Sequence, residues 1–279
     1  MRLAKFKTRP NFITEEDKDT YQAPHHEPGQ ADIDFSTDET EILNRLKYMH
    51  ELHDSGHELA AHGIGHVSGK DWSAQDWLTE LSNYGALFLK VFKDAGYEDA
   101  DELAAEVKGF RAPYLDTSPG LYTALKKLGY RYDTSNDDDA NEWPRKGPEG
   151  LWRFNLADLT VAGTSEKTLS MDYNFYVAQS GTRDIVAKED LFKDQMVETY
   201  MNYFYENYYG NRAPLHIGHH FSPYQGGVYH EALQEFAKQV CGLPEVRCVS
   251  YHELADYMDS IDPETLKEFQ DADFDHLKR

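Results

Sequence analysis

Hydrophobic residues recur at helical spacing in several stretches of this chain. In residues 40–53 the apolar positions are Ile42, Leu43, Leu46 and Met49, and Gly56 follows soon afterwards as a stop signal. The stretch 118–128 carries a serine and then a proline at the first helical position, which is a good helix start. The pattern predicts helices over 40–53, 73–95, 118–128, 190–208, 228–240 and 252–258.

Short apolar runs lie between the predicted helices. They predict strands over 57–62, 107–115, 129–135, 151–156, 168–177, 213–221 and 246–251. Helices that alternate with strands, with polar residues at the carboxyl ends of the strands, are typical of a parallel α/β barrel or an open α/β sheet. We therefore expect an α/β fold with an irregular segment over 1–39, one domain over 40–262 and a charged tail over 263–279.

Composition and charge narrow the class of protein. The 279 residues are 40% hydrophobic and 13% aromatic, which is enough to bury a substantial core. The net charge is −22, from 50 acidic and 28 basic residues. Such a negative field repels polyanions, so the charge disfavours nucleic acid as a partner, and its simplest interpretation is solubility.

The chain has no apolar run that approaches the roughly 18 residues of a membrane helix. Its amino-terminal stretch also lacks the apolar core of a secretory signal. The two cysteines, Cys241 and Cys248, flank a spacer that contains Gly242 and Pro244 and can close into a small loop. We expect a disulfide there, because no histidine or third cysteine stands beside them to form a zinc knuckle. A disulfide points to an oxidising compartment.

Two histidines stand four residues apart in the sequence AHGIGH. His62 and His66 bracket two glycines, which favour a strand that ends in a loop over a continuous helix. Two imidazoles and a carboxylate are a common ligand set for a divalent metal and leave a position open for water or substrate. Taken alone, the pair could equally be two unrelated surface histidines, since the chain contains 13.

A second candidate is the segment GFRAPY. Arg111 keeps its charge and presents a planar fork to carboxylates, so it could fix and polarise a catalytic acid. Pro113 would hold the turn, and the backbone amide of Tyr114 could stabilise a developing oxyanion. By themselves, the four residues Arg111–Tyr114 could form any turn.

The third candidate is the cluster His216, His219 and His220 at the end of an apolar run. A histidine there could act as the general acid for a leaving amine, since its pKa lies near neutrality. If His220 points into a cleft, alternation along the strand turns His219 away from it.

Taken in this order, the segments resemble the polysaccharide deacetylases with the NodB-homology fold, carbohydrate esterase family 4, over residues 40–258. The resemblance is greatest to the chitin-deacetylase-like branch and its tendency to carry disulfides. The segment GHELAAHGIGH resembles the family's motif for two metal ligands, with His57 as a framework residue. The resemblance implies a distorted (β/α) barrel and a divalent metal, zinc first and cobalt or nickel as alternatives. It implies these roles: His62 and His66 as metal ligands; Arg111 and His220 as catalytic residues, with His219 as the alternative acid; Pro113, Tyr114 and Asp133 at the substrate.

The chain departs from the family at the first motif. The family opens with a strand that carries T-F-D-D, whose two aspartates supply the general base and the third metal ligand. In residues 1–40 the nearest stretch to this motif is ADIDFSTDE, and its Asp32 and Asp34 are too close to His62 for the helix and strand that should intervene. We therefore expect an incomplete amino-terminal part of the barrel, and we expect the full-length protein to be secreted or periplasmic. Asp32 or Asp34 as a replacement is the alternative.

The resemblance implies a metal-dependent hydrolase that removes acetyl groups from chitin or a related glycan containing N-acetylglucosamine. Loss of the base should reduce the rate strongly, because general acid–base catalysis alone contributes roughly 10²–10⁴-fold. Two alternatives remain at this stage. One is a carbohydrate-binding protein without catalysis, and the other is an esterase for O-acetyl groups on a glycan such as acetylxylan. The expected partner in each case is an acetylated polysaccharide or oligosaccharide.

Overall fold

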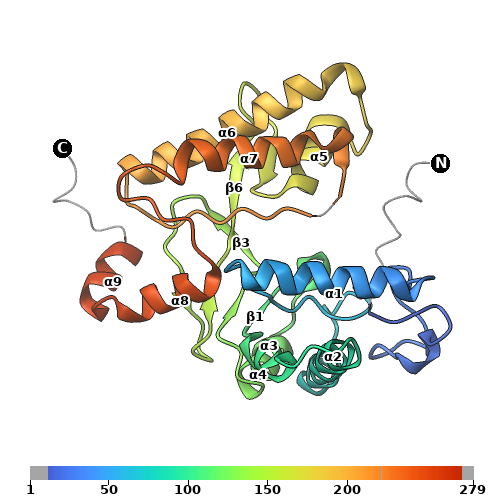
Figure 1. Ribbon diagram of the computed structural model, residues 1–279. Coiled ribbons are helices and arrows are strands. Elements are labelled where there is room, and N and C mark those ends of the chain that lie inside the picture. The colour runs from blue at the N-terminus through green and yellow to red at the C-terminus, as the bar shows by residue number, and fades with distance from the viewer. Residues whose placement is uncertain (1–11, 221, 272–279) are drawn as a thin grey trace. The chain divides into compact units, whose positions relative to one another are not determined.

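The structure, a computed structural model, describes residues 12–220 and 222–271 as a mixed α/β chain (Figure 1). The chain divides into two compact units. The first contains the residues up to Ser135 together with Lys146–Arg153 and Ser250–Ala255, and the second contains Asn136–Arg145, Phe154–Val249 and the residues from Asp256 onward. Each unit has its own sheet and its own helices, and each is described by itself.

Four helices belong to the first unit: α1 (Glu39–Asp54), α2 (Ala74–Asp94), α3 (Ala100–Glu106) and α4 (Pro119–Lys127). Short 3-10 turns cover Lys18–Thr20 and Pro113–Leu115. Helix α2 begins at a capping box in which Ser73 and Asp76 satisfy each other's backbone amides. Its buried face carries aromatic side chains, and it packs against α3 and α4 (Figure 1). This face forms much of the core of the unit.

The sheet of the first unit is built from very short strands. Strand β1 (Gly109–Phe110) pairs in parallel with β2 (Tyr132–Asp133), and β2 pairs in parallel with β5 (Trp152–Arg153). Strand β4 (Arg145–Lys146), where the chain passes from one unit to the other, is the fourth in order. Ala61 forms a parallel bridge to Phe110. The residues that follow Ala61, β1 and β2 therefore emerge at one edge of the sheet.

The second unit has a three-stranded sheet of β3 (Asp137–Asp139), β6 (Leu156–Thr160) and β7 (Lys167–Leu169). Strand β6 is parallel to β3 and antiparallel to β7. The helices of the second unit are α5 (Asp172–Ser180), α6 (Glu189–Tyr209), α7 (Val228–Val240) and α9 (Pro263–Gln270), with 3-10 turns at Val186–Lys188 and Tyr224–Gly227. Helix α8 (Tyr251–Ser260) contributes residues to both units.

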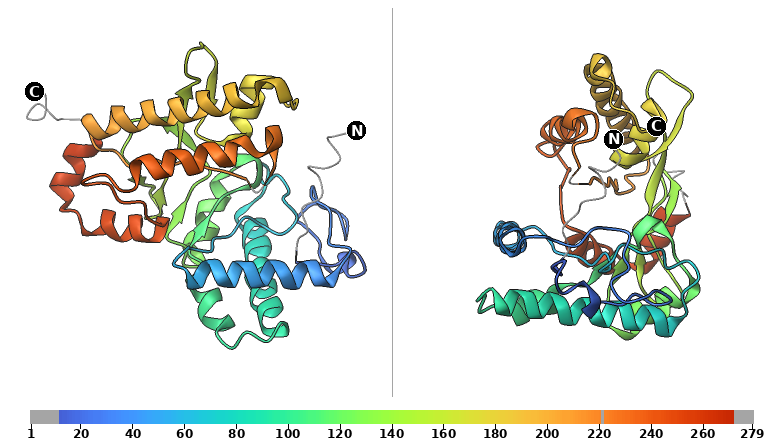
Figure 2. Two further views of the ribbon diagram at one scale, coloured as in Figure 1. Left: turned by 45° about the horizontal axis from the view of Figure 1, so that its top comes forward. Right: turned by 90° about the vertical axis from the view of Figure 1, so that its right-hand side faces the viewer.

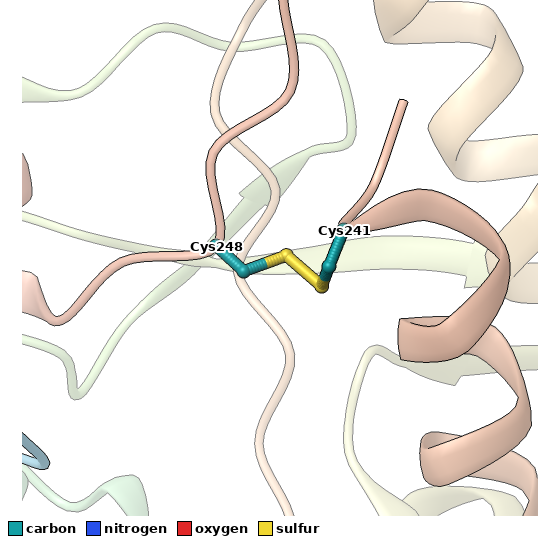
Figure 3. The surroundings of a disulfide bond; sticks show 2 residues. All are labelled: Cys241 and Cys248. Atoms are coloured by element: carbon teal, nitrogen blue, oxygen red, sulfur yellow. A yellow bond between two sulfur atoms is a disulfide. The ribbon is translucent and has the colours of Figure 1, made fainter. Parts of the chain in front are cut away.

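Helices α6 and α7 lie side by side in the second unit (Figure 2). Both bury aromatic side chains, among them Tyr200 and Phe236, whose ring centroids are 5.6 Å apart. Beyond the end of α7, Cys241 and Cys248 form a disulfide with their Cα atoms 5.5 Å apart (Figure 3). The disulfide predicted from the spacing of the cysteines is confirmed.

The helices predicted from hydrophobic periodicity agree with α1, α2, α4, α6, α7 and α8 to within a few residues. The predicted strands agree less well with the structure. The strand predicted over 168–177 is wrong beyond Leu169, since Asp172–Ser180 is helix α5. The described part of 213–221 contributes only the parallel bridge of Gly218 to Met171, 57–62 contributes only the bridge at Ala61, and 246–251 contains no strand. At His216 the backbone amide bonds to the hydroxyl of Tyr203 in place of a neighbouring strand.

The observed sheets agree with only part of the predicted architecture. The mixed α/β class is confirmed, whereas the described strands form two separate sheets and not a closed barrel. The predicted tail over 263–279 begins with α9, whose Phe269 stacks on Trp143 at 4.6 Å. Residues 1–11 of the predicted amino-terminal segment and 272–279 of that tail lie outside the described residues. The domain boundaries at 39 and 262 stay predictions. No helix in the described part of the chain is long and apolar enough to cross a membrane.

Candidate functional site

His62 and His66 lie beside each other at the sheet edge of the first unit. Their ring centroids are 5.0 Å apart and the rings meet edge to face. His62 directly follows the bridge at Ala61, and its Nδ1 lies 2.8 Å from the carbonyl oxygen of Arg111. Because a carbonyl can only accept, neutral His62 carries its proton on Nδ1 and its lone pair on Nε2. A backbone carbonyl that fixes a histidine tautomer in this way is a frequent feature of metal sites.

The turn after β1 brings Tyr114 onto the histidine pair. The Tyr114 ring lies 4.7 Å from the ring of His66, edge to face, and the Tyr114 side chain is 56% exposed. Both residues adopt left-handed backbone conformations, with φ of 53° at His66 and 58° at Tyr114. Such conformations cost roughly 1–3 kcal/mol for a residue other than glycine and tend to occur at functional sites. Pro113, which is buried, begins this turn.

Arg111 joins the histidine loop to the end of β2. Its backbone amide donates to the carbonyl oxygen of Ala61 at 3.1 Å, which positions the carbonyl that His62 uses. Its side-chain Nε donates to Thr134, with 3.2 Å to the carbonyl oxygen and 3.1 Å to Oγ1. The arginine therefore contributes to the site through both its main chain and its side chain. Its predicted catalytic role stays a prediction.

Asp133 lies at the end of β2 and is fully buried. Its carboxylate accepts hydrogen bonds from the Ser135 hydroxyl at 2.7 Å and from the Ser135 amide at 3.2 Å. Burial raises the pKa of Asp133, and Ser135 together with the positive charges of Arg153 and Arg111 opposes that rise. The Ser135 hydroxyl in turn accepts the amide of Ala112 at 2.7 Å. Asp133 thus holds the Arg111–Tyr114 turn, and its predicted role in binding substrate is untested.

The loop between the two histidines rests on a buried carboxylate that the sequence did not point to. Glu80 of α2 is 3% exposed, and burial raises its pKa. It accepts the backbone amide of Ile64 at 2.7 Å and the hydroxyl of Tyr21. The spacing of four residues between the histidines gave no indication of this support, because Glu80 and Tyr21 are distant from the loop in sequence.

In the second unit, His220 is paired with a buried aspartate. The Nδ1 of His220 lies 2.6 Å from Oδ1 of Asp172, and the His220 amide donates to Oδ2 at 2.9 Å. The Asp172 side chain is 2% exposed and that of His220 is 25% exposed. A carboxylate on Nδ1 orients the imidazole, which suits a proton donor that acts through Nε2. Asp172 is not among the residues predicted from the sequence, because the alternation over 168–177 predicts a strand there.

Of the other two histidines of the cluster, His216 is buried and His219 is half-buried. His219 lies 3.1 Å from the hydroxyl of Tyr200 through Nε2, and burial lowers its pKa to about 4. Its Nδ1 has no hydrogen-bond partner among the described residues. His216 is 4% exposed. His219 is therefore neutral near pH 7, whereas His220 has both exposure and a carboxylate partner.

The donor set of the first unit fits a divalent metal at two positions. His62 and His66 supply imidazoles on neighbouring residues of one loop, which suits zinc, cobalt or nickel. In residues 12–220 and 222–271, however, no group of three or more histidine, cysteine, aspartate or glutamate side chains could hold a metal ion. The exposed Asp32 lies near the loop through its backbone, since its amide donates to the carbonyl oxygen of Gly65 at 2.8 Å. The structure thus brings together the two histidines of the expected metal centre, and the metal itself stays a prediction.

No family model matches the chain, and no curated protein matches it either. Solved structures do share its fold. A Mycobacterium smegmatis protein assigned as a polysaccharide deacetylase aligns with a TM-score of 0.53 at 17% identity, over 77% of this chain and 68% of that one. A Pseudomonas aeruginosa PAO1 protein with the same assignment gives 0.52 at 15% identity, over 79% and 65%. The Puue allantoinase gives 0.52 at 16% identity, also over 79% and 65%.

These similarities concern the fold. The chain spans about two thirds of each of those structures, and the identity is low. The mixed α/β fold expected from the resemblance to polysaccharide deacetylases is therefore confirmed at that level. Because the structures that share the fold carry the names of two different activities, the fold leaves the substrate open.

Proposed function

We propose that this protein is a hydrolase of the polysaccharide deacetylase type, which removes acetyl groups from chitin or a related glycan that contains N-acetylglucosamine. The observation that carries the proposal is the His62–His66 pair with Nδ1 of His62 fixed on the Arg111 carbonyl. The similarity in fold to structures assigned as polysaccharide deacetylases supports it.

The two histidines would hold a divalent metal, zinc first, through His62 Nε2 and the ring of His66. When bound, such an ion polarises a carbonyl and lowers the pKa of a bound water. The chain's own residues prepare the loop for this role. Arg111 supplies the carbonyl that orients His62, and Asp133 holds the Arg111–Tyr114 turn through Ser135.

The second unit would supply a proton donor. The Asp172 carboxylate holds Nδ1–H of His220, so a protonated His220 can release the proton on Nε2 to a leaving amine. His219 is a poorer candidate, because its lowered pKa of about 4 leaves it without a proton to donate near neutrality. We assign the acid to His220 on the geometry of its own unit.

Acetate release tests this function. The full chain is incubated with Zn²⁺ or Co²⁺ and N-acetylated chitin oligomers, beside the variants His62→Ala and His220→Ala. We expect metal-dependent acetate release that His220→Ala reduces by about 10²-fold or more, as is common for general acid–base groups. His62→Ala should also reduce the release, because it removes a metal ligand. Release that persists at the wild-type rate in His62→Ala, or in the presence of a chelator, would contradict the assignment.

The same assay separates the two rival functions. An O-acetyl esterase would release acetate from acetylxylan and not from chitin oligomers. A carbohydrate-binding protein would retain glycan on a column in the presence of chelator and in His62→Ala. The second rival has a specific observation in its favour, which is the lack of a third ligand among the described residues.

The compartment is also a proposal. The disulfide between Cys241 and Cys248 favours an oxidising environment, so we propose that the protein lies outside the cytoplasm, secreted or periplasmic. A polymeric glycan substrate agrees with that location. Alkylation of the thiols in protein taken directly from the native cell would test it, with protection of both cysteines as the expected result.

A further inference from the structure

Two side chains of the first unit accept hydrogen bonds from the loop that carries His62 and His66. The Ile64 amide donates to Oε1 of Glu80 at 2.7 Å, and the Gly65 amide donates to the hydroxyl oxygen of Tyr21 at 3.2 Å. The Tyr21 hydroxyl donates in turn to the Glu80 carboxylate, with 3.2 Å to Oε2 and 3.3 Å to Oε1. Two consecutive amides between the histidines are thus bound by one connected pair of side chains.

The glycines of the loop fit this arrangement. A Cβ atom at Gly65 would lie 2.7 Å from the ring and the hydroxyl of Tyr21, which is closer than real contacts allow. Gly63 has a φ of +75°, a left-handed conformation that glycine adopts without strain. The sequence between the two histidines therefore lets the backbone turn and come directly against Tyr21. The same turn places His66 at its own left-handed φ of 53°.

Both side chains of this network are buried, so each depends on its hydrogen-bond partners within the protein. Glu80 is 3% exposed and Tyr21 is 3% exposed, so neither side chain can replace a lost partner with bulk water. A buried carboxylate is stable only when its oxygens accept hydrogen bonds. Each oxygen of Glu80 already does so, and Glu80 is not part of any ligand group of three in the described chain. Its geometry suits support of the loop better than direct coordination.

We propose that Glu80 and Tyr21 are positioning residues that hold the loop in the shape in which His62 and His66 bind a divalent metal. This inference rests on the proposed function for the metal. It goes beyond that function because it names the residues that determine the conformation of the loop. The chain forms the left-handed turn before any ion arrives, because the carboxylate and the tyrosine bind the amides of Ile64 and Gly65. Preorganised ligands lose less entropy on binding.

The test uses the full chain with the variants Glu80→Gln and Tyr21→Phe. The matched control is Tyr84→Phe, which removes a buried hydroxyl one turn further along α2, outside the network. Amide hydrogen exchange is followed in metal-free protein, and Zn²⁺ affinity is measured by calorimetry with zinc salt alone. Thermal unfolding of each variant reports whether the rest of the protein is intact.

We expect Ile64 and Gly65 to exchange about tenfold faster in both variants, while amides within α4 and the Tyr84→Phe protein stay at the wild-type rate. Zinc affinity should fall by about 10- to 100-fold, the range found when groups that orient metal ligands are removed. Unchanged exchange at Ile64 and Gly65 would overturn the inference. So would a loss of zinc affinity in Tyr84→Phe as large as in Tyr21→Phe.

The two proposals can fail separately. If the wild-type chain binds no zinc, the proposed metal function fails, and the exchange of Ile64 and Gly65 in metal-free protein still decides whether Glu80 and Tyr21 hold the loop. If wild-type protein binds zinc and Glu80→Gln binds it equally well with faster loop exchange, the metal function stands and the positioning role is overturned.

Discussion

The dependence of stability on pH tests the burial of His219 in the second unit. The Nδ1 atom of its ring is buried and has no hydrogen-bond partner among the described residues. A proton added there would create a buried N–H donor without an acceptor, which is costly. Burial accordingly lowers the pKa of His219 from 6.5 to about 4, with a smaller opposing influence from Asp172 and smaller supporting ones from His230 and His220.

The lowered pKa of His219 determines whether the protein gains or loses stability as the pH falls. Between pH 6.5 and pH 4 the unfolded chain takes up a proton at position 219 that the folded chain refuses, so the folded state loses stability as the pH falls. At 1.36 kcal/mol per pH unit, the interval from 6.5 to about 4 corresponds to about 3 kcal/mol. About 2–3 kcal/mol of this should be lost between pH 7.5 and pH 4.5.

The perturbation is His219→Gln, which keeps a polar group beside Tyr200 and removes the titration. Free energies of unfolding are measured by urea titration from pH 7.5 to pH 4.5 for wild type, His219→Gln and the control His57→Gln, an exposed histidine. The stability of wild type relative to His219→Gln should fall by about 2–3 kcal/mol over this range. The His57 control should follow wild type. Parallel curves for wild type and His219→Gln would refute the reasoning.

Three further changes test separate contacts. Asp172→Asn should destabilise the protein by roughly 1.5–3 kcal/mol in urea unfolding, because it disrupts charged hydrogen bonds to His220, and a cost below about 0.5 kcal/mol would contradict the pairing. Gly65→Ala should cost about 1–3 kcal/mol through overlap with Tyr21, whereas the control Gly85→Ala, with nothing near its Cβ position in α2, should be neutral or stabilising by up to about 1 kcal/mol. Replacement of Cys241 and Cys248 by alanine should cost about 2–3 kcal/mol for a loop with a sequence separation of 7, and an unchanged melting temperature would argue against the disulfide.

The helices could be predicted from the sequence because their information is local. Helix α1 has an aspartate cap and apolar residues at regular spacing, and α2 has both members of a capping box. The strands could not be predicted with the same success. Those of the first unit are only two residues long, so alternation has no length over which to repeat. At Asp172 the structure placed a helix where apolar and polar residues alternate as in a strand.

The residues of the candidate site also fall into those that could be predicted from the sequence and those that could not. The residues of the AHGIGH and GFRAPY segments could be recognised because each motif lies within a few residues of the chain. Their supports could not be recognised, because Glu80 is 16 residues from Ile64 and Tyr21 is 44 residues from Gly65. Asp172 and His220 are 48 residues apart. Only the fold brings such partners together, although the two glycines between the histidines were a signal that another group comes close to that loop.

Zinc binding by the histidine pair tests the central claim most directly. Calorimetry on the full chain compares wild type with His62→Ala, His66→Ala and the control His57→Ala. We expect one ion per chain in wild type and in the control, and a loss of affinity of at least about tenfold in each of the other two variants, since each removes a ligand. Zinc that binds His62→Ala and His66→Ala as tightly as wild type, or no binding by wild type, would contradict the account.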